Sequence, residues 1–193
     1  KPAPHFKAMA YWDGKLKEIS LDMFKGQYVL LVWYPLDFTF VCPTEILDFS
    51  DKAKLFEDEK CQVIFASVDS QFAHKEFALK DRKKGGLGPM RIPILSDLSH
   101  KISRDYGCLI DDANDGDSGA AFRATYIIDE EGTVVHESVN HMPLGRNVNE
   151  FLRLIDAYTH VQEKGEVCPA NWEEGKDAMK ENRDGVADYL SKH

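Results

Sequence analysis

No two of the four cysteines in this 193-residue sequence are close enough to form a Cys-x-x-Cys pair. This excludes the usual zinc ribbon and the dithiol motif of thioredoxin-type reductants. A secreted disulfide scaffold is also a poor fit, because such scaffolds are short and rich in cysteine. The sparse cysteines therefore favour a protein of a reducing compartment: Cys42, Cys61, Cys108 and Cys168.

The sequence also lacks long apolar runs and an excess of positive charge. Its longest apolar run, residues 28–36, is far too short to cross a bilayer, so no membrane span is expected. The formal net charge of −9 argues against a nucleic-acid partner, because phosphate backbones attract basic surfaces.

The lack of secretory signals in the sequence favours a cytoplasmic location. No secretory leader and no Asn-x-Ser/Thr glycosylation acceptor occur. The chain begins at Lys1 rather than at a methionine. A mitochondrial location after removal of a presequence is therefore the alternative.

Two signals in the first third of the chain predict strands. The Asp13-Gly14 pair between two strand-like arms is typical of a tight hairpin. The apolar run at 28–34 is typical of a strand buried on both faces. Four apolar residues then recur at intervals of three and four, which predicts one helix before a second buried strand at 61–69: Ile46, Phe49, Ala53 and Phe56. This β–α–β order implies parallel pairing of the two strands.

The remaining segments add elements around that unit. We expect a helix over 72–84, a short strand at 92–97, a short helix closed by Gly107, and an exposed acidic loop at 111–119. An antiparallel hairpin follows over 122–139.

The last third of the chain is predicted to be helical at both ends. Asn147 is expected to cap a long helix, with Glu150 at capping-box spacing, and a short helix is expected near 186–190. The whole order indicates an α/β, thioredoxin-like fold, with a central mixed sheet flanked by helices, an N-terminal hairpin and a C-terminal tail extension. We expect the domain to span 1–164, and the tail of 165–193 to belong to the same structural domain.

Cys42 differs from the other cysteines in its surroundings. Pro43 fits the first turn of a helix, where its missing N–H costs nothing. The sulfur of Cys42 then lies at a helix N-terminus, where free N–H groups and the helix dipole favour the thiolate. Thr39, three residues earlier, offers a hydroxyl to the same pocket, and Pro35 ends the strand and can shield the sulfur from water. Cys42 is therefore predicted to be a reactive thiol.

The other two cysteines of the core region suit a structural interpretation. Cys61 opens a predicted strand and Cys108 lies beside a turn. Buried cysteines of this kind behave as small apolar residues.

The segment YPLDFTFVCPTEI, residues 34–46, resembles the active-site segment of the typical two-cysteine peroxiredoxins. These are thiol peroxidases built on the thioredoxin fold. The resemblance covers nearly the whole chain through six further segments in the right order: PAPHFKA at 2–8, ASVDS at 66–70, GGLGPM at 85–90, FRATYIID at 122–129, PLGR at 143–146 and GEVCPANW at 165–172.

The resemblance implies a role for each residue that matches the family motifs. Cys42 matches the peroxidatic cysteine, and Cys168 matches the resolving cysteine. Arg123 matches the arginine that holds the thiolate and the peroxide. Pro35 and Thr39 match the remaining residues of the pocket. Glu45 and Arg146 match the polar residues that support it.

The resemblance also implies the reaction and the partners. Cys42 would reduce hydrogen peroxide and organic hydroperoxides through a sulfenic acid, form a disulfide with Cys168 of the partner subunit, and be recycled by thioredoxin or a related dithiol protein. The tail would then extend onto the partner of a homodimer, and five dimers often form a ring, a decamer, in this family. No metal and no organic cofactor is required.

Two features depart from the family pattern. The terminal Tyr-Phe pair of easily over-oxidised members reads Tyr189-Leu190 here, which predicts intermediate sensitivity to over-oxidation. The acidic loop at 111–119 is longer than usual.

Two other functions compete with a peroxidase. One is a redox-controlled chaperone or signalling adaptor that uses Cys42 as a peroxide sensor. The other is a cysteine hydrolase, which needs a histidine base paired with the thiol. The histidines show no ligand or catalytic spacing and are interpreted as surface or loop residues: His5, His74, His100, His136, His141, His160 and His193.

Overall fold

A computed structural model describes all residues of the chain, 1–193. Contacts within the chain divide it into two compact units, Lys1–Arg146 and Asn147–His193. The division falls at the start of the long helix, whereas the sequence placed the change from domain to tail at residue 165. No helix combines the length and the apolar character that crossing a bilayer demands.

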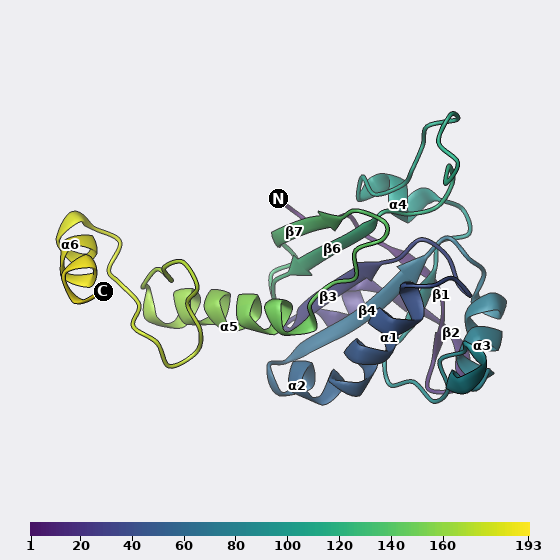
Figure 1. Cartoon of the computed structure of the whole chain (residues 1–193), viewed down its shortest axis with the longest axis horizontal. Helices are drawn as coiled ribbons and strands as arrows, with labels where there is room; N and C mark the ends of the chain where they lie inside the picture. Colours follow the sequence, from purple (N-terminus) through teal and green to yellow (C-terminus); the bar gives the residue numbers. More distant parts are fainter. The chain divides into compact units, whose positions relative to one another are not determined.

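The first unit is built on a seven-stranded mixed sheet with the order β2-β1-β5-β4-β3-β6-β7 (Figure 1). Its strands are β1 Lys7–Trp12, β2 Lys15–Ser20, β3 Tyr28–Trp33, β4 Cys61–Ser67, β5 Ile94–Ser96, β6 Arg123–Ile128 and β7 Val134–Asn140. β3 pairs with β4 in parallel and with β6 in antiparallel orientation. The predicted β–α–β unit, both hairpins and the mixed sheet are therefore confirmed.

The helices of the first unit are short. They are α1 Cys42–Asp51, α2 Ala53–Asp58, α3 Gln71–Leu79 and α4 Lys101–Asp105, with single 3₁₀ turns at Leu21–Phe24 and Arg82–Lys84. α1 and α2 follow β3 in the chain and lie beside each other (Figure 1), with α2 against β4. This connection brings the start of α1 to the carboxyl end of β3.

Two predicted helices differ from the observed ones. The single helix expected after Cys42 is broken at Lys52, whose ψ of 7° leaves the helical range. Its predicted apolar face is still buried on both pieces. The helix expected over 72–84 ends at Leu79, because Lys80 is extended and Asp81 caps a separate turn. Gly86 packs so closely against the Lys80 carbonyl that a Cβ would lie 2.1 Å from its oxygen, which explains a glycine there.

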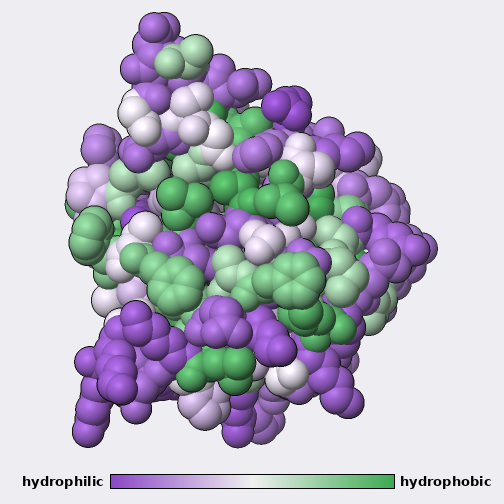
Figure 2. Space-filling view, turned by 90° about the vertical axis from the view of Figure 1, so that its right-hand side faces the viewer, coloured by the Kyte–Doolittle hydropathy of each residue, from purple (hydrophilic) through white to green (hydrophobic).

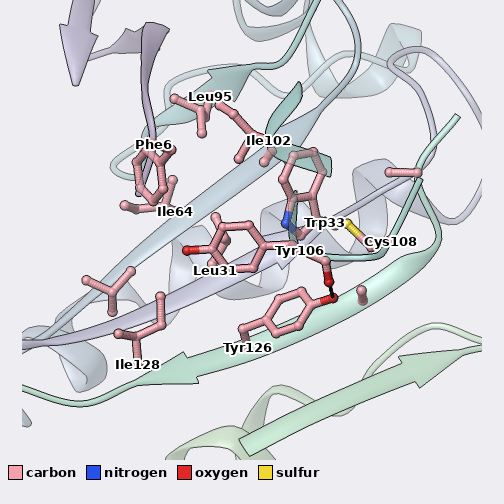
Figure 3. Packing of buried hydrophobic residues seen from close by; sticks show 14 of the residues in the cluster. Phe6, Leu31, Trp33, Ile64, Leu95, Ile102, Tyr106, Cys108, Tyr126 and Ile128 are labelled. Atoms are coloured by element: carbon pink, nitrogen blue, oxygen red, sulfur yellow. Dashed lines mark hydrogen bonds between the residues drawn. The ribbon is translucent and has the colours of Figure 1, made fainter. Parts of the chain in front are cut away.

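The core lies on the strands at the centre of the sheet. All six residues of β3 and all six of β6 are buried, because each strand lies between two neighbours in the sheet. β3 is apolar throughout, whereas β6 also buries the polar side chains of Arg123 and Thr125. Figure 3 shows the packing of Leu31 and Trp33 with side chains from the neighbouring strands and from α4. The Tyr126 hydroxyl donates to the Tyr106 carbonyl at 2.8 Å within this cluster (Figure 3).

The second unit contains α5 Val148–Lys164 and α6 Arg183–Lys192. Asn147 caps α5, as predicted, by accepting a hydrogen bond from the Asn149 N–H at 3.1 Å. The Glu150 carboxylate pairs with Arg153. A short bridge between Val167 and Met179 closes the segment between the two helices.

Candidate active site

The sulfur of Cys42 lies at the first residue of α1 and is fully buried. Pro43 occupies the first turn, as predicted, and the Thr44 hydroxyl donates to the Val41 carbonyl at 2.6 Å. The Thr44 and Glu45 N–H groups both donate to the Val41 carbonyl, at 3.0 and 3.3 Å, and the positive end of the helix dipole favours an anion at this end of α1. The backbone therefore provides a setting that favours a thiolate.

The Thr39 hydroxyl lies 2.9 Å from the Cys42 sulfur. The same hydroxyl lies 3.0 Å from the Leu36 carbonyl oxygen, which can only accept. A hydroxyl has one proton to donate. An anionic sulfur therefore attracts that proton away from the carbonyl, and Thr39 can answer a change of charge on the sulfur by rotating its O–H.

Arg123 approaches the sulfur from the first residue of β6. Its Nη1 lies 3.3 Å from the Cys42 sulfur and 2.9 Å from a Glu45 carboxylate oxygen, and its Nε donates to the Met142 carbonyl. The side chain is almost completely buried. The planar fork of a guanidinium can make these contacts at the same time, and it stays charged in the interior.

Glu45 and Arg146 support this arginine. Both carboxylate oxygens of Glu45 accept from the Arg146 guanidinium, at 2.8 and 2.9 Å, and the Arg146 N–H donates to one of them. Arg146 also donates to the Ala124 carbonyl and to the Thr125 hydroxyl. Two buried cations and one buried anion leave one positive charge beside the sulfur, which a Cys42 thiolate balances.

Six of the seven predicted site residues lie in the first unit, and hydrogen bonds join five of them: Thr39, Cys42, Glu45, Arg123 and Arg146. Pro35 is buried directly after β3 and Tyr34, at the start of the loop that carries Thr39. Cys168 belongs to the second unit, where its thiol lies 3.5 Å from the Ala157 carbonyl and is partly exposed. Burial raises the pKa of Cys168, and the nearby Arg153 guanidinium opposes that shift.

The two cysteines interpreted as structural are buried free thiols. Burial raises the pKa of Cys61 far above its ordinary value and raises that of Cys108 to about 12. A thiol that stays protonated is a poor nucleophile. Neither cysteine therefore competes with Cys42 at neutral pH.

The interpretation of His74 as a surface or loop residue is wrong. His74 lies on α3 and is fully buried, with its Nδ1 2.8 Å from the Asp37 carboxylate. The Tyr34 hydroxyl donates to the other oxygen of Asp37. The spacing of His74 from Phe77 and Ala78, three and four residues on, placed it on the apolar face of the predicted helix and could have revealed its burial.

Comparison with known proteins agrees with the geometry over the whole chain. The model of the AhpC/TSA family matches residues 1–137, and that of the C-terminal domain of 1-Cys peroxiredoxin matches residues 157–192, which include Cys168. Among curated proteins, peroxiredoxin tpx1 of Schizosaccharomyces pombe is 50% identical over 193 residues, which cover 100% of this chain and 97% of that protein.

Two further relatives show the same similarity. A mitochondrial thioredoxin-dependent peroxide reductase of Rattus norvegicus is 51% identical over 190 residues, 98% of this chain and 72% of that protein. The reduced crystal structure of a 2-Cys peroxiredoxin of Plasmodium vivax superposes with a TM-score of 0.93 at 44% identity, over 99% of this chain and 97% of the other. These matches confirm the thioredoxin-like fold that the sequence predicted.

Proposed function

Because the chain belongs to the AhpC/TSA family and is a typical two-cysteine peroxiredoxin, its activity is that of a thioredoxin-dependent peroxidase, and we propose that Cys42 is the thiolate that attacks the peroxide. The observation that carries this proposal is the convergence on one sulfur of the Thr39 hydroxyl and the Arg123 guanidinium, at 2.9 and 3.3 Å. Both can donate hydrogen bonds to an anion at this buried sulfur.

In the first step the sulfur takes one oxygen from the peroxide. The Cys42 thiolate attacks this oxygen, the O–O bond breaks, and the electron pair of that bond leaves with the second oxygen as hydroxide or alkoxide. Cys42 becomes a sulfenic acid, and the leaving group takes up a proton from solvent. Thr39 and Arg123 stabilise the negative charge as it moves from sulfur to oxygen.

In the second step Cys168 of the partner subunit resolves the sulfenic acid. Its thiol attacks the Cys42 sulfur, a disulfide forms and water leaves. The tail of residues 165–193 supplies this cysteine and extends onto the partner of a homodimer. Thioredoxin or a related dithiol protein then reduces the disulfide by thiol–disulfide exchange.

We also propose that dimers assemble further, into a decamer. Several exposed apolar side chains belong to α3 and to the loop before α1, and the side of the molecule in Figure 2 shows apolar surface among hydrophilic surroundings. They include Leu36, Phe38, Phe40, Phe72 and Leu79, of which Phe40 is 92% exposed. Apolar surface of this kind is typical of an interaction site. Sedimentation of the reduced protein tests the assembly, and a dimer at all concentrations would contradict it.

The few, widely spaced cysteines support a reducing compartment, and we propose the cytoplasm, with the mitochondrion as the alternative. Fractionation of cells with an antibody to the protein distinguishes the two.

A non-reducing gel tests the two cysteine roles. One equivalent of hydrogen peroxide is added to the reduced wild type and to the variants Cys42→Ser and Cys168→Ser. We expect a linked dimer for the wild type only. A dimer that survives replacement of Cys168 would assign resolution to Cys61 or Cys108, and a dimer in Cys42→Ser would contradict the proposed attack.

A further inference from the structure

Three polar side chains form a buried cluster directly after β3. Tyr34 and His74 are fully buried, and the side chain of Asp37 is 1% exposed. We call Tyr34, Asp37 and His74 the anchor cluster. None of the three takes part in the proposed chemistry at the sulfur. Buried polar groups are costly unless they are paired, so a cluster of three needs an explanation.

The hydrogen bonds of His74 fix where its protons lie. Its Nε2 lies 3.2 Å from the Leu95 carbonyl oxygen on β5, which accepts only, so Nε2 carries a proton. Its Nδ1 lies 2.8 Å from Asp37, and this contact also needs a proton between the two groups. The pair therefore holds one shared proton, either as imidazolium and carboxylate or as imidazole and carboxylic acid.

The other groups around the pair are also ordered. Burial, and then the charge of Asp37, raises the pKa of Tyr34 well above its ordinary value, so its hydroxyl remains a donor to Asp37 at 2.5 Å. The Asp37 N–H donates to the Asp69 carboxylate at 2.9 Å, and Asp69 accepts in addition from the Ser67 hydroxyl at 2.6 Å. Asp37 therefore has hydrogen bonds to residues of three segments: Tyr34 directly after β3, His74 on α3, and Asp69 after β4.

The cluster is linked to the sulfur by a short stretch of chain. Phe38 follows Asp37 with a φ of +57°, a conformation that a non-glycine residue keeps only when its surroundings hold it. The Phe38 ring packs on Phe77 of α3 with ring centroids 4.7 Å apart. Thr39 comes next and contacts the Cys42 sulfur. Because one residue separates Asp37 from Thr39, the position of the hydroxyl depends on the anchor cluster.

We infer that Asp37 and His74 are positioning residues that hold the loop of residues 35–41 closed over Cys42, so that the hydrogen bonds between them govern how often the sulfur is exposed to a second cysteine. This inference rests on the proposed role of Cys42. The Cys42 sulfur is fully buried when the loop is closed, so it cannot meet a sulfur of another chain until the loop opens.

The state of the loop decides between two fates of the Cys42 sulfenic acid. In the open state the thiol of Cys168 of the partner subunit attacks the sulfur, and a disulfide and water form. In the closed state the sulfenate can attack a second peroxide, so that its sulfur gains an oxygen and becomes sulfinic, while the peroxide leaves as water or an alcohol. A weaker anchor cluster therefore favours disulfide over sulfinic acid.

Hydrogen exchange of the reduced protein tests the inference without any turnover. In His74→Gln, the amides of Asp37 and of the first turn of α1, Thr44 and Glu45, are expected to exchange about tenfold faster or more, because the buried hydrogen bond between residue 74 and Asp37 is lost. Amides of β4 and β6 are expected to be unchanged. Glu76→Gln, an exposed neighbour on α3, is the matched control and should leave all rates as in the wild type.

A second readout measures the two fates directly. After excess peroxide, mass spectrometry is expected to find less Cys42 sulfinic acid in His74→Gln than in the wild type and Glu76→Gln. Tyr34→Phe, which removes one hydroxyl only, should change both readouts in the same direction by less. Unchanged exchange of the Asp37 amide, or faster exchange throughout the sheet, would overturn the inference. Exchange that changes as predicted with no oxidation of Cys42 would instead contradict the proposed function.

Discussion

Arg123 and Cys42 lie 81 residues apart in the chain, yet the Arg123 Nη1 is 3.3 Å from the Cys42 sulfur. The pairing of β3 with β6 makes this contact, because it brings the first residue of β6 to the end of β3 from which the loop to α1 departs. The positive charge of Arg123 therefore lies next to the Cys42 sulfur because β3 and β6 are paired in the sheet.

Replacing Arg123 by lysine should reduce kcat/KM for hydrogen peroxide about a hundredfold. Lysine keeps the charge but lacks the planar fork that joins the sulfur, Glu45 and the Met142 carbonyl. Stopped-flow measurement of Cys42 oxidation reports the loss. The control Arg104→Lys changes an exposed arginine and should leave the rate constant unaltered. Equal effects of the two changes would refute the assignment of Arg123.

Replacing Thr39 by valine should lower the same rate constant by about a hundredfold, because one donor to the reacting atoms is lost. Thr39→Ser retains the hydroxyl and should stay close to the wild type. A valine variant as fast as the serine variant would show that the Thr39 hydroxyl is not required for the reaction.

Replacing Glu45 by glutamine should lower the free energy of unfolding by about 3–5 kcal/mol, because two buried guanidinium groups lose their shared counter-ion. The matched control is Asp48→Asn in the same helix. Asp48 forms an exposed ion pair with Lys52, so its loss should cost at most about 1 kcal/mol. Urea unfolding followed by circular dichroism measures both, and similar values for the two variants would be inconsistent with the buried network.

Alkylation of the native protein should spare the two buried thiols of Cys61 and Cys108. Cys61 and Cys108 should resist iodoacetamide at about pH 8, because their raised pKa keeps them protonated and burial excludes the reagent.

The same raised pKa values make the free energy of unfolding depend on pH. The stabilisation from burying these two neutral thiols is fully present below the pKa of an unfolded cysteine, about 8.5. It declines as pH rises toward the folded value, by about 1.4 kcal/mol per pH unit for each thiol. Rapid alkylation of Cys108 in the native protein at about pH 8 would contradict this description.

Local sequence signals were sufficient for most of the fold. The hairpin at Asp13-Gly14, the buried β3 and the cap at Asn147 each depend on residues that are neighbours in the chain. The break at Lys52 was missed because the apolar face continues across it, so periodicity alone shows one helix.

The site was predictable only in part. Helix start, proline and threonine indicated Cys42 from local sequence, whereas Arg123 and Arg146 depended on resemblance to a family. The contact of His74 with Asp37 joins α3 to the loop before α1 and is made by the packing of these elements, which no local pattern in the sequence shows.

The central claim is that the Cys42 sulfur reacts directly with peroxide. The most direct test treats reduced Cys168→Ser with one equivalent of hydrogen peroxide in the presence of dimedone, and locates the adduct by peptide mass spectrometry. The account predicts a sulfenic acid adduct on Cys42 alone. An adduct on Cys61 or Cys108 with none on Cys42, or peroxide consumed with no adduct at all, would contradict it.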